Sequence, residues 1–112
     1  MFNIFKKGKE PKNLKEVLKE FEELKKEVER ISKQSKFFVQ KIGVVRYNPF
    51  SGVGGDQSFS IALLDGNNDG VVITSIYARD GNRVFGKPVK EGKSEYSLSD
   101  EERGAIEKAI KS

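Results

Sequence analysis

The chain has 112 residues, a formal net charge of +4 and a hydrophobic fraction of 36%, values typical of one small soluble domain with an extension. It contains no cysteine and no histidine, which excludes disulfide-stapled scaffolds, thiolate chemistry and imidazole-based catalysis or zinc binding. We therefore expect a protein that is not an enzyme, has no catalytic or metal-ligating residues and binds no cofactor.

Residues 1–12 form a basic N-terminal arm, in which three large apolar side chains precede a cluster of lysines. Two interpretations remain open: a frayed terminus, or a segment that binds an anionic membrane surface weakly and reversibly. No apolar stretch is long enough to span a bilayer or to act as a signal peptide. We expect a cytoplasmic protein, in the second case located at the inner face of the cell membrane. The candidate membrane-contacting residues are Phe2, Ile4, Phe5, Lys6, Lys7 and Lys9.

Residues 13–36 are expected to form an amphipathic helix. Asn13 can cap its start, and Glu16 follows three residues later as in a capping box. Apolar residues recur at spacings of three and four, in the a and d positions of three heptads. This apolar seam, a candidate oligomer interface, consists of Leu14, Val17, Phe21, Leu24, Val28 and Ile31.

Two packing partners for this seam remain open: a second copy of the helix, or a globular core. Glu20 and Lys25 occupy a g position and the following e position, a pattern that suits a parallel coiled-coil dimer. Leu18 beside Val17 widens the apolar stripe, as in a helix that lies on a globular core.

Residues 37–112 are expected to form a small α+β domain. Runs rich in β-branched residues predict strands over residues 41–47, 58–64 and 71–78, and a short strand over 83–87. Pro88 favours an edge position for the last strand. Ser99 and Glu102 form a capping box before a final helix that ends near Lys111. The fold class is therefore α+β: an N-terminal amphipathic or coiled-coil helix, a four-stranded mainly antiparallel sheet and a C-terminal helix.

One polar loop is a candidate ligand or partner site. If the first two strands pair as a hairpin, the glycine-rich segment between them gathers polar side chains at one end of the sheet. An ion pair between Arg46 and Asp56 that closes the loop is the structural alternative. The candidate residues are Arg46, Tyr47, Asn48, Gly54, Gly55 and Asp56.

Two further motifs favour structural interpretations. Residues 65–70 (DGNNDG) match the first half of a calcium-binding loop, but Ile76 stands where the bidentate glutamate is required, so we expect a hairpin turn. Basic and aromatic residues alternate near Arg79 and Arg83, but residues 36–112 are almost charge-neutral, which argues against nucleic-acid binding.

The runs VVRYNPF, VGGDQSFSIALLD, GVVITSIYARD and KPVKEGKSEYSLSDEE strongly resemble a bacterial family known as domain of unknown function 4446. The resemblance covers nearly all of residues 14–111. It implies a membrane-spanning helix, a charged coiled segment and then this domain; here the first twelve residues cannot span a membrane. The family has no assigned activity, so the resemblance supports the architecture only.

The expected function is a non-enzymatic interaction or scaffold protein. Its expected partner is a second copy of the chain or another protein, with weak attachment to a membrane surface. The alternative is a small-molecule-binding or hydrolytic domain that uses the polar loop around Arg46, Asn48 and Asp56.

Overall fold

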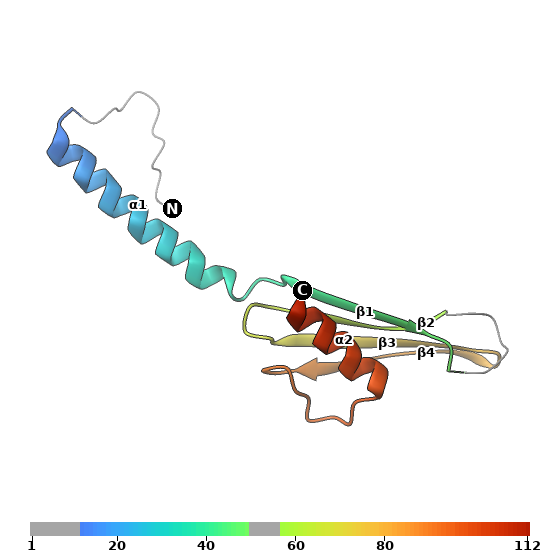
Figure 1. Ribbon diagram of the computed structural model, residues 1–112. Coiled ribbons are helices and arrows are strands. Elements are labelled where there is room, and N and C mark those ends of the chain that lie inside the picture. The colour runs from blue at the N-terminus through green and yellow to red at the C-terminus, as the bar shows by residue number, and fades with distance from the viewer. Residues whose placement is uncertain (1–11, 50–56) are drawn as a thin grey trace. The chain divides into compact units, whose positions relative to one another are not determined.

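The computed structural model describes residues 12–49 and 57–112. The chain divides into two compact units, residues 1–36 and 37–112. The described part of the first unit contains helix α1, and the second contains four strands and helix α2 (Figure 1).

Helix α1 spans Leu14–Ser35. The Asn13 side chain accepts a hydrogen bond from the Glu16 backbone N–H at 2.9 Å, so the predicted N-cap is confirmed. None of its residues is buried. Among the described residues, no helix is long and apolar enough to cross a membrane.

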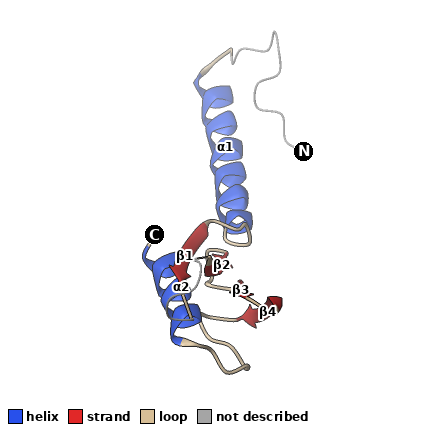
Figure 2. Ribbon diagram, turned by 90° about the vertical axis from the view of Figure 1, so that its right-hand side faces the viewer, coloured by secondary structure: helices blue, strands red, loops and turns tan. Residues whose placement is uncertain are grey.

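The second unit is built on an antiparallel sheet in which neighbours in sequence are neighbours in space, in the order β1-β2-β3-β4. Every strand pair is antiparallel, and Figure 2 shows α2 packed on one side of the sheet. This confirms the expected α+β fold. The strands are β1 (Lys41–Tyr47), β2 (Ser58–Leu64), β3 (Gly70–Ala78) and β4 (Gly81–Val89).

The bounds of β1 and β2 agree with prediction, but β4 is longer than the predicted 83–87. Its pairing with β3 continues to the Ala78–Gly81 pair, so only Arg79 and Asp80 remain in the turn. Gly81 has a φ of +145°, a conformation that glycine adopts at little cost. Pro88 lies in an edge strand, as expected.

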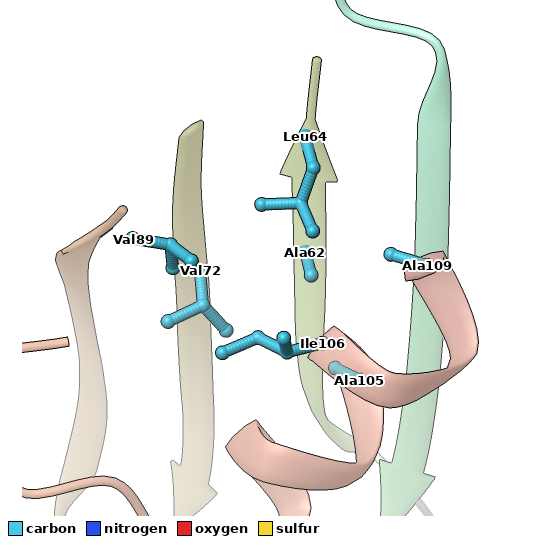
Figure 3. Packing of buried hydrophobic residues seen from close by; sticks show 7 residues of the cluster. All are labelled: Ala62, Leu64, Val72, Val89, Ala105, Ile106 and Ala109. Carbon is cyan, nitrogen blue, oxygen red and sulfur yellow. The ribbon is translucent and has the colours of Figure 1, made fainter. Parts of the chain in front are cut away.

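Helix α2 spans Asp100–Lys111 and begins with the predicted capping box of Ser99 and Glu102. Its buried stripe packs on β1, β2 and β3. Figure 3 shows the resulting hydrophobic core. Ile110, near the end of the same helix, is exposed. The core residues are Ala62, Leu64, Val72, Val89, Ala105, Ile106 and Ala109.

The two faces of the sheet carry different side chains. The face under α2, the covered face, contains small or polar residues such as Gly43, Ser60, Ala62 and Thr74, all buried. A Cβ atom at Gly43 would lie 2.1 Å from the Ala105 carbonyl oxygen, so the backbones of β1 and α2 meet directly.

The opposite face carries most of the large apolar residues of the sheet, and we call it the open face. Within residues 37–49 and 57–112, no helix or strand covers it. Its exposed apolar residues are Ile42, Val44, Tyr77, Val84 and Pro88, and its half-buried ones are Phe59, Ile61, Leu63, Val71 and Ile73. Its residues are Ile42, Val44, Arg46, Phe59, Ile61, Leu63, Val71, Ile73, Ser75, Tyr77, Asn82, Val84, Gly86 and Pro88.

Candidate functional site

A polar pocket lies on the covered face beside the start of α2. Its volume is about 430 Å³. It combines strand residues from β1, β3 and β4 with the segment that begins the helix, as expected of a small-ligand site in which a few polar groups converge. The lining residues are Tyr47, Pro49, Thr74, Ile76, Phe85, Lys87, Ser97, Leu98, Ser99, Glu101 and Glu102.

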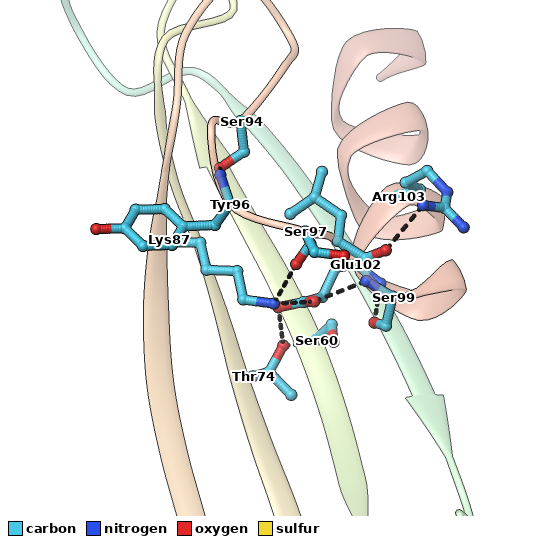
Figure 4. Close-up of polar contacts among 10 residues, drawn as sticks. Ser60, Thr74, Lys87, Ser94, Tyr96, Ser97, Ser99, Glu102 and Arg103 are labelled. Atoms are coloured by element: carbon cyan, nitrogen blue, oxygen red, sulfur yellow. Dashed lines mark hydrogen bonds and ion pairs between the residues drawn. The ribbon is translucent and has the colours of Figure 1, made fainter.

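An ion pair between a buried carboxylate and a half-buried ammonium group lines this pocket. Glu102 is 1% exposed, and its Oε1 atom accepts a hydrogen bond from the Lys87 ammonium group at 2.8 Å. The Ser99 backbone N–H donates to the same oxygen at 2.9 Å. The Thr74 hydroxyl donates to Oε2, also at 2.9 Å (Figure 4). Both carboxylate oxygens are therefore occupied by protein donors.

These bonds determine the charge state of Glu102. Burial by itself raises the pKa of a carboxyl group. Here the hydrogen bonds from Lys87, Ser99 and Thr74, together with the lysine charge, outweigh burial, and the pKa of Glu102 lies below its ordinary value of 4.5. The carboxylate is thus held ionised inside the domain.

The network extends across the sheet to Tyr47. The hydroxyls of Ser60 and Thr74 lie 2.8 Å apart. Since Thr74 donates its proton to Glu102, Ser60 is the donor to Thr74. Burial raises the pKa of the Tyr47 phenol above 10.0, and a hydrogen bond with Ser60 opposes that shift.

The network is better suited to stability than to catalysis. In the described ranges, every buried side-chain nitrogen and oxygen atom has a hydrogen-bond partner. A general base needs a lone pair directed at its substrate, whereas Glu102 already accepts three bonds. The arrangement instead fixes the start of α2 on the sheet.

The candidate polar loop is only partly described. Gly54, Gly55 and Asp56 lie outside the described residues, so the Arg46–Asp56 ion pair stays a prediction. Strand alternation places Arg46 on the open face and Tyr47 on the covered face. Of the three candidate loop residues that the structure describes, Tyr47 lines the pocket; exposed Asn48 follows the end of β1.

The sequence predicts only a capping role for Glu102. A signal was present, because residues 102, 105, 106 and 109 follow the helical spacing of one face. A carboxylate within a buried stripe requires a buried partner, which Lys87 supplies.

The turn at residues 65–70 is a closed structural turn, as predicted. The Asp65 carboxylate accepts hydrogen bonds from the backbone N–H groups of Asn67 and Asp69, at 2.8 and 3.0 Å. Asp69 accepts a bond from the Glu91 N–H at 2.8 Å. The two aspartate side chains of the calcium-binding pattern thus bind the turn's own backbone and the neighbouring loop.

The apolar seam of α1 is a second candidate site. Its six residues, from Leu14 to Ile31, are between 39% and 73% exposed. Large apolar residues that are gathered in one stripe, rather than scattered singly, mark an interaction surface. The arm residues Phe2, Ile4, Phe5, Lys6, Lys7 and Lys9 lie outside the described residues.

The described residues define an α+β domain with an added amphipathic helix and two exposed apolar surfaces, the α1 seam and the open face. The chain belongs to the family described as "Protein of unknown function (DUF4446)", whose model matches residues 5–110. The family resemblance is thereby confirmed, and nothing in it points to an enzymatic activity. No curated protein and no solved structure is significantly similar to the chain.

Proposed function

We propose that this protein is a non-enzymatic interaction module that forms a homodimer through the apolar seam of α1. The observation that carries the proposal is the exposure of all six seam residues, at 39–73%, in a helix with no buried residue. Such a seam gains stability by packing knobs into holes of a partner helix.

A second copy of α1 is the partner best matched to the seam. In a parallel dimer, Glu20 at a g position lies close to Lys25 at the following e position of the partner, which pairs opposite charges. Residues 13–35 carry six basic and six acidic side chains, so two copies meet without net repulsion.

The dimer can be tested with two substitutions that change charge equally. Leu24→Lys adds one positive charge inside the seam, whereas Glu29→Gln removes one negative charge from the outer side of the helix. By sedimentation equilibrium of the full chain, we expect a dimer for the unmodified protein and for Glu29→Gln. We expect at least a tenfold weaker dimer for Leu24→Lys. A monomer at all micromolar concentrations for the unmodified chain would reject the proposal.

The polar pocket supports the alternative function less well. The alternative is a small-molecule-binding or hydrolytic domain that uses the loop around Arg46, Asn48 and Asp56. Arg46 lies on the open face, away from this pocket, and the pocket's buried carboxylate is already bonded to Lys87, Ser99 and Thr74. A ligand that used this carboxylate would have to break those hydrogen bonds, whereas binding through the seam breaks none of them. We therefore place the interaction role first.

The basic arm adds a weak membrane-binding role to this proposal. A dimer presents two arms together, and paired weak contacts bind far more tightly than one. We expect the full chain to co-sediment with vesicles that contain anionic lipid. The triple variant Lys6→Glu/Lys7→Glu/Lys9→Glu should lose most of that binding; equal co-sedimentation of both proteins would exclude an electrostatic role for the arm.

A further inference from the structure

The open face of the sheet is an apolar surface to which the proposed α1 dimer assigns no partner. Two adjacent rows across the sheet contain no charged residue. One row is Ile42, Leu63, Val71 and Pro88, and the next is Val44, Ile61, Ile73 and Gly86.

We infer that the open face is a second dimer interface, occupied by the open face of a second copy of this chain. This inference rests on the α1 dimer proposed above and extends it to the α+β domain. Two sheets packed face to face, with side chains interdigitating across a layer about 10 Å thick, are a common stable arrangement.

Charge distribution favours a second copy as the occupant. A two-fold axis brings residues near the centre of an interface close to their own equivalents in the partner. Any charged residue there would meet a like charge, which is destabilising. The rows that begin at Ile42 and Val44 have none, and Arg46, in the adjacent row, lies in the edge strand β1.

Exposed apolar residues also continue along the chain from the seam to the face. Between α1 and β1, Phe37, Phe38 and Val39 are all exposed. In a parallel coil both copies of Ser35 lie at the same end, and a five-residue connection reaches at most about 18 Å. The coil would therefore hold the two sheets at high effective concentration.

The area needed for a stable dimer gives a further reason to combine the two surfaces. A four-stranded face with seven-residue strands covers roughly 440 Å² as a flat surface. A seam about 33 Å long and 10 Å wide adds roughly 330 Å². Together they come to roughly 770 Å² of flat area, the same order as the 800 Å² or so of accessible surface per partner in a standard interface.

Matched lysine substitutions test whether the face contributes to association. Val44 on the open face and Ile110 on α2 are similarly exposed, at 43% and 39%, so lysine should fold at either position. By sedimentation equilibrium of the full chain, we expect Val44→Lys to weaken the dimer at least tenfold. Ile110→Lys should change the dissociation constant less than twofold.

Single cysteines identify the occupant, because the chain has no cysteine of its own. Under copper–phenanthroline oxidation, Ile61→Cys near the centre of the face should give a disulfide-linked dimer. Glu107→Cys, an exposed site on α2, should give little. Leu24→Cys tests the α1 coil separately. A result that rejects the open-face interface can therefore be told apart from a result that rejects the proposed α1 dimer.

Two outcomes would overturn the inference. In the first, Leu24→Cys forms a cross-linked dimer, Ile61→Cys does not, and Val44→Lys leaves the dimer unchanged; the coil then stands without the face. In the second, a Leu24→Cys/Ile61→Cys double variant closes a disulfide within one chain. The chain's own helix would then occupy the face, and both proposals would fail.

Discussion

The two faces of the sheet differ in what they can pack against. The covered face has glycine, alanine and serine in the strands nearest α2, and a helix backbone reaches it closely enough that a Cβ at Gly43 would overlap Ala105. The open face has phenylalanine, isoleucine, leucine and valine in the same strands. The middle of this pair of strands thus presents small side chains on one face and large side chains on the other.

This difference shows that burial in this domain does not follow side-chain hydrophobicity alone. The more apolar face is the one left without cover, while Ser58, Ser60 and Thr74 are buried. Those hydroxyls are tolerated because each is hydrogen-bonded within the domain. Large apolar residues that have no cover inside a domain are typical of an interface between molecules.

The largest expected effect comes from a glycine-to-alanine substitution on the covered face, compared with the same substitution on the open face. Gly43→Ala would place its Cβ 2.1 Å from the Ala105 oxygen and 2.5 Å from the Ala109 nitrogen, both backbone atoms that cannot rotate away. We expect a loss of about 3 kcal/mol or more in the free energy of unfolding, measured by urea denaturation.

Gly86→Ala is the matched control on the open face. Its Cβ would meet only ordinary contacts, the nearest at 3.5 Å from Val71, so we expect a change within about 0.5 kcal/mol. Similar losses for the two variants would contradict the view that only the covered face is closely packed.

A smaller effect is expected from titration of the buried carboxylate. Glu102 has a pKa below 4.5 in the folded protein, whereas in the unfolded chain it has its ordinary value. As pH falls below 4.5, the unfolded chain takes up the proton first, so stability is lost as pH falls through the folded pKa. Urea denaturation between pH 6 and pH 3 measures this loss.

Glu102→Gln removes the titratable carboxyl group. Comparing this variant with the parent measures how much Glu102 contributes to the loss of stability at low pH. We expect the variant to be less stable than the parent at pH 6, because Lys87 loses its ionic partner. The difference between the two proteins should shrink as pH decreases. A constant difference across that range would exclude a coupling of Glu102 ionisation to folding.

The order and type of the elements could be predicted from the sequence, because each strand is a β-branched or alternating run bounded by turn residues. The start of β4 could not, since Gly81 and Asn82 resemble turn residues and are strand residues only through pairing with Ala78 and Tyr77. Local sequence carries no information about that register.

The covered face and the pocket were harder to predict for a different reason. Alternation in β2 separates Phe59, Ile61 and Leu63 from Ser58 and Ser60, but it does not say which set faces a helix. That choice depends on how closely α2 can approach, which involves Gly43 from another strand. Likewise, the partners of Glu102 are 28 residues away at Thr74 and 15 away at Lys87, beyond any local motif.

The contacts of Glu102 also affect the order in which parts of the domain unfold. Helix ends usually fray independently of the structure around them. Here the residue that completes the cap with Ser99 is also the buried partner of Lys87 and Thr74. The first turn of α2 cannot unwind without exposing an ionic pair inside the domain, so helix start and sheet contact form one cooperative unit.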